Sequence, residues 1–378
     1  MTERLYEIDS HISEFDAQII SVTKTEDGYI TVLDRTAFFP EGGGQASDTG
    51  AINGVSVDYV FMDNNVIYHC TKEPLEKGKA KCILDFDRRF AFMQNHSGEH
   101  IVSGIVNEKY GFDNVGFHLG EDFVTLDFNG VLSRAQLDEI EYEANKRVWQ
   151  NVKFKAWYPS KEELQKLPYR SKKEIDGDIR IVQIENTDMC ACCAPHVKEA
   201  GEIGIIKLLD FEALRGGIRI FMKCGEFALK DYRNKYENAL KISATLAAKQ
   251  NSIADVVLQL EKKYEDEKHK VSALNKRITD NIVKGFNTEL DGVIEENFEI
   301  KELQMLADGL HKTYGGIKSA FSKCDGGYNF AICGDVESLD EFFKYLKTKL
   351  NIRGGGRNGM VQGCVFADMS EISKYFKF

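Results

Sequence analysis

The sequence predicts an α+β protein with a β-rich N-terminal subdomain, an α+β core, a long helical segment and a small C-terminal α/β domain. Over the first 85 residues, short runs rich in Val, Ile, Tyr and Phe alternate with turn residues, which is typical of β structure. The stretch 226–284 contains neither proline nor glycine and repeats apolar residues at helical spacing. A single hydrophobic core rarely grows beyond about 250–300 residues. The chain has 378 residues, which favours several domains.

Residues 1–87 form the predicted β-rich subdomain. Pairs such as Asp27-Gly28, Asn53-Gly54 and Asn64-Asn65 favour tight turns between its strands. The predicted strands are Gln18–Thr23, Tyr29–Leu33, Val55–Phe61, Val66–Tyr68 and Ala80–Asp85. A glycine-rich loop, Phe39–Gln45, separates two of them, and its glycines permit backbone conformations that other residues resist.

Residues 88–223 form the predicted core. Helical periodicity predicts one helix from about Arg88 to Tyr110 and a second from about Ser133 to Gln150, with Ser133 as the N-cap. The segments with a strand pattern are Phe123–Phe128, Ile179–Ile184, Gly204–Leu209 and Arg219–Lys223. Helices and strands therefore mix in this part of the chain.

Residues 224–285 are predicted to form a long amphipathic helix or a helical hairpin. Leaving an apolar stripe in water costs about 25 cal/mol per Å², so the stripe should meet another helix. The partner is either the same stretch, folded back at Gln250-Asn251-Ser252, or the equivalent helix of a second chain in a homodimeric coiled coil. We expect the dimer.

Residues 286–378 are predicted to form a small α/β domain. The predicted strands are Phe298–Leu303, Tyr328–Cys333 and Gly363–Ala367, and the predicted helices are Met305–Thr313 and Leu339–Leu350. Alternation of strands with helices is the basis of this assignment.

The composition favours a cytoplasmic protein. No run of about 18 apolar residues appears and the N-terminus is charged, so neither a membrane span nor a secretory signal is expected. The chain has nine cysteines, of which Cys190, Cys192 and Cys193 lie close together, which suggests a metal site or a reactive thiol. The net charge of −11 argues against indiscriminate nucleic-acid binding. A local basic patch still attracts phosphate, because fields act within a Debye length of about 8–10 Å.

Two residue pairs predict a zinc site. His96 and His100 are four apart on a predicted helix, so both imidazoles project from one face. Cys192 and His196 are also four apart, in a turn-rich segment between strand patterns. These four side chains are of the types that zinc prefers. A conventional metalloprotease is not indicated, because there Glu follows the first His, whereas here Glu99 precedes the second.

The residues around these pairs closely resemble the alanyl-tRNA editing family, which comprises the editing domain of alanyl-tRNA synthetase and the free-standing AlaX proteins. The matching segments are Leu33–Gln45, Asp48–Gly50, Asn95–His100, Cys192–His196 and Gly201–Gly204, in the family's order. The resemblance implies that His96, His100, Cys192 and His196 are the zinc ligands. One departure is Ala194-Pro195, where the family often has Gly-Thr, so any hydrogen bond of that threonine is lost here.

The C-terminal part resembles the DHH-associated domain that ends the synthetase and the long AlaX proteins. The likeness rests on the segment Arg353, Gly354, Gly355, Gly356 and Arg357, followed by Gln362-Gly363. A glycine run lets backbone N–H groups approach phosphate while arginine supplies charge, although an ordinary glycine turn would look the same. The resemblance thus points to the long AlaX type. Because the editing pattern starts near the N-terminus, no aminoacylating ligase activity is expected.

Several cations between the two halves of the metal site are candidates for tRNA binding. We expect contacts from Lys153, Lys155, Lys172 and Lys173, in addition to Arg353 and Arg357. The cluster to which these lysines belong comprises Lys146, Arg147, Lys153, Lys155, Lys161, Lys166, Arg170, Lys172 and Lys173. A solvated lysine-rich surface is the alternative reading.

These observations favour a zinc-dependent hydrolase that deacylates mischarged alanine tRNA in trans, with serine removed first and glycine second. Candidates for catalytic or substrate contacts are Gln45, Glu99 and His118. Gln45 and His118 could equally serve a structural role, and for Glu99, which flanks the second histidine, the structural role is favoured. The alternative is a tRNA-binding module in which zinc is purely structural, since four protein ligands complete a tetrahedron. A phosphodiesterase is disfavoured, because the chain lacks the clustered aspartates of a two-metal site.

Overall fold

The computed structural model describes residues 2–120, 123–171 and 178–378. The chain forms two compact units, Met1–Leu240 and Lys241–Phe378. Both units mix helices with strands, in agreement with the predicted α+β class.

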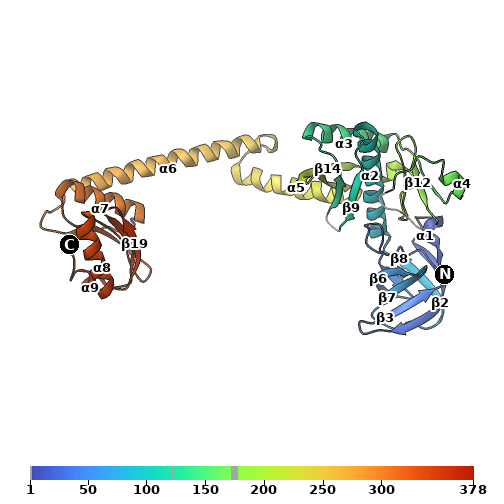
Figure 1. Ribbon diagram of the computed structural model, residues 1–378, viewed down its shortest axis with the longest axis horizontal. Coiled ribbons are helices and arrows are strands. Elements are labelled where there is room, and N and C mark those ends of the chain that lie inside the picture. Colours follow the sequence, from blue (N-terminus) through green and yellow to red (C-terminus); the bar gives the residue numbers. More distant parts are fainter. Residues whose placement is uncertain (1, 121–122, 172–177) are drawn as a thin grey trace. The chain divides into compact units, whose positions relative to one another are not determined.

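The first unit begins with a closed barrel of strands (Figure 1), joined in the order β2-β3-β7-β6-β5-β8. The bounds are β2 Glu14–Lys24, β3 Tyr29–Leu33, β5 Gly50–Ile52, β6 Val55–Asp63, β7 Val66–Thr71 and β8 Gly78–Leu84. Alternate side chains point inward along each strand, so Ala17 and Ile19 of β2 are buried with Ala80 and Cys82 of β8. The strands predicted here are confirmed, and β5 is an additional one. Two short strands pair beside α1 (Leu5–Ile8), and they are β1 Glu3–Arg4 and β4 Arg35–Thr36.

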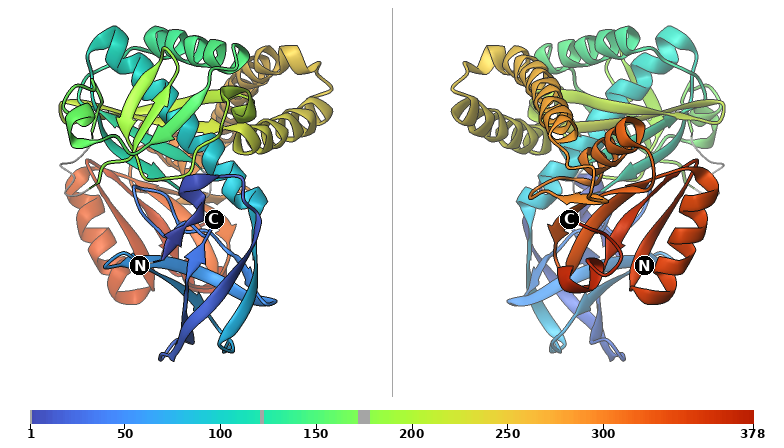
Figure 2. Two further views of the ribbon diagram at one scale, coloured as in Figure 1. Left: turned by 90° about the vertical axis from the view of Figure 1, so that its right-hand side faces the viewer. Right: turned by 90° about the vertical axis from the view of Figure 1, so that its left-hand side faces the viewer.

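Helix α2 (Phe86–Tyr110) leads from the barrel into the rest of the first unit, as the cyan helix in both views of Figure 2 shows. There it packs on helix α3 (Arg134–Trp149) and on an antiparallel sheet ordered β14-β15-β10-β9. The sheet's strands are β9 Asn114–Leu119, β10 Val124–Phe128, β14 Ile206–Leu214 and β15 Gly217–Cys224. Helix α3 starts as predicted, because Ser133 caps it in a capping box with Gln136.

A second, smaller sheet of the first unit carries the segment that leads to Cys192. Its order is β11-β12-β13, and all its pairs are antiparallel. The bounds are β11 Phe154–Trp157, β12 Ile181–Ile184 and β13 Asp188–Ala191, with helix α4 Lys161–Leu164 and the 3₁₀ turn η1 Ala200–Ile203 nearby in sequence. Cys192 follows β13 directly, so the strand fixes where the cysteine loop starts.

The helical stretch is interrupted where the hairpin turn was predicted. Helix α5 (Gly225–Leu246) ends before a 3₁₀ turn, Gln250–Ser252, and helix α6 (Ile253–Lys284) follows. Apolar side chains along α6 are exposed, among them Val257, Leu260 and Tyr264. Such an exposed stripe is unfavourable in water, and the homodimer stays a prediction.

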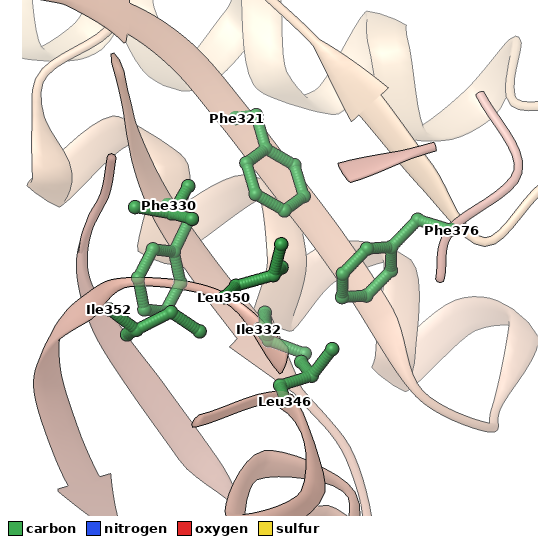
Figure 3. A pocket seen from close by; sticks show the side chains of 8 residues that line it. Phe321, Phe330, Ile332, Leu346, Leu350, Ile352 and Phe376 are labelled. Atoms are coloured by element: carbon green, nitrogen blue, oxygen red, sulfur yellow. The ribbon is translucent and has the colours of Figure 1, made fainter. Parts of the chain in front are cut away.

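The second unit contains a sheet with helices on both faces. Its order is β16-β17-β18-β20-β19, and the bounds are β16 Gly292–Ile294, β17 Lys318–Cys324, β18 Gly327–Cys333, β19 Ile352–Arg357 and β20 Met360–Val365. Alternate residues of β18 reach opposite sides, so Phe330 packs toward helix α8 (Val336–Lys349) and Ala331 toward helix α7 (Ile300–Tyr314). Figure 3 shows the α8 side, where a small gap is lined only by apolar side chains and therefore belongs to the core. The chain ends after helix α9 (Met369–Ile372).

One sequence prediction for the second unit is corrected by the structure. The segment Phe298–Leu303 is not a strand, because helix α7 already begins at Ile300. Leu303, Leu306 and Leu310 recur at helical spacing and are fully buried against the sheet. This burial of one helical face favours a helix over a strand for the segment. The glycine run lies in β19, which pairs with β20 alone among the described residues, so the alternative of an ordinary glycine turn does not apply.

Among the described residues, no helix combines the length and the apolar character needed to cross a lipid bilayer.

Candidate metal centre

Helix α2 places two of the predicted ligands in the interior of the first unit. Its N-terminus is capped by the Asp85 carboxylate, which accepts the backbone N–H of Arg88, and it ends at Gly111 in a left-handed conformation. The residues from Ala91 to Val106 are almost all buried, so this helix is covered on every side. His96 and His100 lie in this part and are each only 2% exposed.

The other two ligands lie on a loop that is fastened to its surroundings. Nη1 of Arg180 donates to the carbonyl oxygens of Cys192 and Ala194, at 3.1 and 2.9 Å. The hydroxyl oxygen of Ser97 on α2 accepts the backbone N–H of Val197 at 3.2 Å. Arg180 therefore fixes the loop to the start of β12, and Ser97 fixes it to the helix that carries the histidines.

The four predicted ligands converge on one point. One donor atom from each of His96, His100, Cys192 and His196 lies within 4.8 Å of the others. Sγ of Cys192 is 3.6 Å from Nε2 of His96 and 3.3 Å from Nε2 of His196. Around a tetrahedral zinc with Zn–N near 2.05 Å and Zn–S near 2.3 Å, ligand atoms stand about 3.3–3.6 Å apart. These residues therefore fit a zinc ion in both their chemistry and their spacing.

Hydrogen bonds behind the rings favour the orientation that metal binding needs. Nδ1 of His96 lies 2.8 Å from Oε1 of Gln45, and Nδ1 of His196 lies 3.2 Å from the Ser97 hydroxyl. An amide oxygen only accepts, so His96 carries its proton on Nδ1 and leaves Nε2 free. Nδ1 of His100 faces the Asp188 carboxylate at 3.4 Å.

The pKa shifts of Cys192 and His196 suit a metal, whereas Cys190, Glu99 and Asp188 raise the pKa of His100 despite its burial, so this imidazole must lose a proton to bind one. Burial alone would raise the pKa of the Cys192 thiol, but the His96 and His196 imidazoles beside it hold that pKa well below its ordinary value. Burial lowers the pKa of His196 to about 3. A thiolate and a neutral imidazole are the forms that bind zinc.

A second group of potential ligands shares His100 with the first and consists of His100, Asp188 and Cys190. Sγ of Cys190 is 2.9 Å from Nδ1 of His100, and Arg170 holds both oxygens of Asp188 at 2.8 Å. Burial raises the pKa of the Cys190 thiol, which disfavours the thiolate that a metal requires. Asp188, Arg170 and Cys190 therefore support His100 from behind. Their positions in the sequence carry no signal of this role.

The glycine-rich loop brings Gln45 to the cluster. At Gly44, whose φ is +84°, a Cβ atom would lie 2.6 Å from the carbonyl oxygen of Phe117, so only glycine fits there. The loop continues into a bridge between Gln45 and Leu119. Gln45 is 1% exposed, and its amide nitrogen has no hydrogen-bond partner among the described residues. A buried donor without a partner beside a metal cluster is a candidate for contact with a substrate.

A buried ion pair ties this loop to α2. Asp48 and Arg89 are fully buried, and Nε of Arg89 donates to both carboxylate oxygens at 2.9 and 3.0 Å. Nη2 of Arg89 also donates to the Ala37 carbonyl at 2.6 Å, and Asp48 accepts the backbone N–H of Phe39 at 2.6 Å. The pair thus joins both ends of the glycine-rich loop to the helix that carries His96.

The other two candidate contacts differ in their relation to the cluster. Glu99 is 1% exposed, and its Oε1 accepts from Ser103 and Asn114 at 2.6 and 2.7 Å. Its Oε2 lies 3.7 Å from Nε2 of His100, which places Glu99 beside the candidate metal centre. His118 is exposed on β9, whereas its neighbour Phe117 packs on the His96 ring at 4.7 Å. Successive strand residues point to opposite faces, so His118 is directed away from the cluster.

The predicted tRNA-binding residues lie in both units. Lys153 and Lys155 are exposed in and next to β11 of the first unit, and Lys172 and Lys173 lie outside the described residues. In the second unit the segment Arg353–Arg357 forms the edge strand β19, and both of its arginines are exposed.

Comparison with known proteins agrees with this geometry. The family model described as "Threonyl and Alanyl tRNA synthetase second additional domain" matches residues 179–220, which include Cys192 and His196. The loop with Cys192 and His196 therefore lies within the segment that resembles this domain.

Whole proteins give a more specific match. The alanyl-tRNA editing protein AlaX-L of Pyrococcus horikoshii is 29% identical over 98% of this chain and 96% of its own length. The alanine–tRNA ligases of Pyrococcus abyssi and Ignicoccus hospitalis are 30% and 28% identical over 96% and 94% of this chain. The chain spans only 42% and 40% of those ligases. It therefore resembles an AlaX-type alanyl-tRNA editing protein along nearly its full length, as the motifs predicted.

Proposed function

We propose that this protein is a zinc-dependent hydrolase that removes serine, and less efficiently glycine, from mischarged alanine tRNA. The observation that carries the proposal is the convergence of His96, His100, Cys192 and His196 within 4.8 Å. The similarity to an alanyl-tRNA editing protein over 98% of the chain supports the substrate class.

The reaction would be hydrolysis of the ester between the amino acid and the terminal ribose of tRNA. Zinc held by the four ligands would supply Lewis-acid chemistry, either to the ester carbonyl or to a water. Three neutral imidazoles and one thiolate would leave the site with a net charge near +1, which favours an oxyanion over a cationic amino group. The surrounding network, with Gln45 behind His96 and Asp188 behind His100, would keep the ligands oriented.

Gln45 is the side chain best placed to contact the substrate. Its Oε1 is occupied by His96, so its amide nitrogen remains free to donate. A buried donor left unpaired costs free energy, and a substrate hydroxyl or carbonyl that accepts its hydrogen bond would relieve that cost. Serine carries a hydroxyl and alanine does not, so a site that pairs this group rejects alanine strongly.

The second unit is proposed to capture tRNA as a DHH-associated domain. On its edge strand β19, Arg353 and Arg357 flank three glycines, so cationic side chains and open backbone groups lie side by side. Charged groups of this kind suit phosphate oxygens. The ligands of the proposed zinc site all lie in the first unit, so this contact would serve affinity and not chemistry.

A tRNA-binding module with a structural zinc is the second candidate. It is favoured by the same four ligands, because four protein donors complete a tetrahedron and leave no open position. The free amide of Gln45 favours the enzyme, since a structural site has no use for an unpaired donor beside it.

The decisive test is deacylation of alanine tRNA charged with serine, glycine or alanine. The hydrolase should release serine fastest, glycine more slowly and alanine least, and a chelator should abolish release. A structural module should bind zinc and tRNA but release none of the three amino acids above the uncatalysed rate. Gln45→Glu keeps the acceptor behind His96 but removes the amide donor, so it should keep bound zinc while lowering serine release. Unchanged release would exclude the Gln45 amide from the contact.

A further inference from the structure

A polar pocket of the first unit adjoins the metal centre and contains three cationic residues. Its walls come from helix α1 and the residues after it, from β11, from the start of β12 and from residues 196–198. The cations are Lys155, Arg180 and Lys198. We call this feature the three-cation pocket. His196, one of the four proposed zinc ligands, forms part of its wall.

The charges in the three-cation pocket do not cancel. Two carboxylates also line it, Glu7 and Asp9. Glu7 is paired at 3.1 Å with Arg4, which is not among the lining residues, so it does not neutralise the lysines. Asp9 is paired with Lys198 at 2.9 Å. Lys155 and Arg180 remain as positive charge, which favours an anionic ligand.

The cations differ in how freely they can meet a ligand. Nη1 of Arg180 donates to the carbonyl oxygens of Cys192 and Ala194, so this side chain already stabilises the loop and is not free to turn toward a ligand. The Lys198 side chain is 56% exposed, and an exposed ion pair such as Lys198–Asp9 is weak enough to exchange for a phosphate. Nζ of Lys155 stands over the Trp157 ring at 5.1 Å and is exposed. The two lysines are therefore the groups that can reorient toward an anion.

The pocket also has an aromatic wall next to the metal. Phe154 lines it and stacks on the His196 ring, with centroids 6.2 Å apart and planes inclined by 20°. Phosphate-binding lysines beside an aromatic ring are the combination that binds single-stranded nucleic acid, because the lysines track the backbone and the ring contacts a base. Here that combination borders a proposed zinc ligand.

We propose that the three-cation pocket holds the 3′-terminal nucleotide of the acylated RNA, with its phosphate on Lys155 and Lys198. This proposal rests on the proposed hydrolysis, because the ester to be cleaved is attached to that nucleotide. Anchoring the phosphate one nucleotide from the ester would place the ester at the metal. The lysines would then act on binding and leave the chemical step unchanged.

The test is steady-state deacylation of seryl alanine tRNA by the full-length protein and the double variant Lys155→Ala/Lys198→Ala. We expect KM to rise roughly tenfold with kcat within about twofold. The slope of log KM against the logarithm of the salt concentration should decrease by about 1–2, because two phosphate contacts are lost. Lys207→Ala is the matched control, because Lys207 is also an exposed, ion-paired lysine of the first unit, held by Glu141 at 2.6 Å. It should leave KM and the salt dependence unchanged.

A second measurement separates this proposal from the proposed hydrolysis. Binding of an uncharged RNA that ends in CCA is measured by fluorescence anisotropy, which requires no catalysis. The double variant should bind this RNA about tenfold more weakly than the wild type and the Lys207→Ala control. Equal binding by all three proteins overturns the pocket assignment, even if deacylation proceeds. If the wild type releases no serine, the hydrolysis fails, yet weaker RNA binding by the double variant still supports the pocket. A loss of zinc or of kcat alone in the double variant would overturn the proposal, because it would assign the lysines to the metal loop.

Discussion

Arg89→Met removes the cation that joins helix α2 to the glycine-rich loop, and it should strongly destabilise the first unit. Arg89 and Asp48 are both fully buried, so the variant leaves the Asp48 carboxylate buried with the backbone N–H of Phe39 as its one remaining donor among the described residues. Removing one partner of a buried ion pair typically costs about 3–5 kcal/mol. The whole stability of a folded protein is about 5–15 kcal/mol, so a large part of it would be lost.

The chain offers a convenient probe for this measurement. It has two tryptophans, Trp149 and Trp157, and both lie in the first unit. Denaturant unfolding followed by tryptophan fluorescence therefore reports on the first unit, whatever the second unit does. Bound zinc should be measured in parallel, because metal loss would also lower the denaturant concentration at which half of the protein is unfolded, the unfolding midpoint.

The control is Lys81→Met, which breaks the exposed ion pair of Lys81 with Glu14 at 3.2 Å. Exposed pairs contribute about 0–1 kcal/mol, so its midpoint should stay near that of the wild type. Adding Asp48→Asn to Arg89→Met should cost less than the sum of the two single changes, because the double variant buries no unpaired charge. Equal midpoints for Arg89→Met and Lys81→Met would refute the reasoning.

Three further predictions concern the metal, the tRNA and the assembly. Cys192→Ala should lower bound zinc and serine release together, as measured by metal analysis and deacylation, while its neighbour Cys193→Ala should keep both. Arg353→Ala/Arg357→Ala should weaken binding of full-length tRNA in a filter assay but leave hydrolysis of a short acylated RNA nearly unchanged. Light scattering should give twice the 42.8 kDa of one chain, and Leu260→Asp on the exposed stripe of α6 should return the mass to one chain.

Each of these predictions has an outcome that contradicts it. Full zinc occupancy and activity in Cys192→Ala would remove the site as proposed and shift attention to Cys190. Undiminished tRNA affinity without Arg353 and Arg357 would mean that the glycine-rich edge strand serves something else, such as self-association. A monomeric mass for the wild type would refute the dimer and favour pairing of the helical stretch with itself.

Local features of the fold could be predicted from the sequence, because they depend on residues only a few positions apart in the chain. Ser133 caps α3 as expected, since a capping box needs only residues three positions apart. The break between α5 and α6 coincides with Gln250–Ser252, where polar residues interrupt the apolar period. The prediction failed at Phe298–Leu303, where a short apolar run fits a strand as well as a helix, and only packing of Leu303 on the sheet decides.

At the candidate metal site, too, some features could be predicted from the sequence and others depend on the tertiary structure. Two four-residue spacings in the sequence single out His96 with His100 and Cys192 with His196, because a helical turn or a tight loop brings such neighbours together. That the two pairs meet is a property of the tertiary structure, which brings residues 96 positions apart in the chain to 3.6 Å, as between Cys192 and His96.

The residues that surround the proposed ligands could not be predicted from the sequence, for a physical reason. Asp188, Arg170 and Ser97 acquire their roles only when β13 and the cysteine loop pack on α2, and nothing in their local spacing marks them. Spacing along the chain determines which side chains can share one face of an element. Contacts between distant elements determine which of those side chains are oriented, desolvated and left with a free hydrogen bond, as Gln45 is.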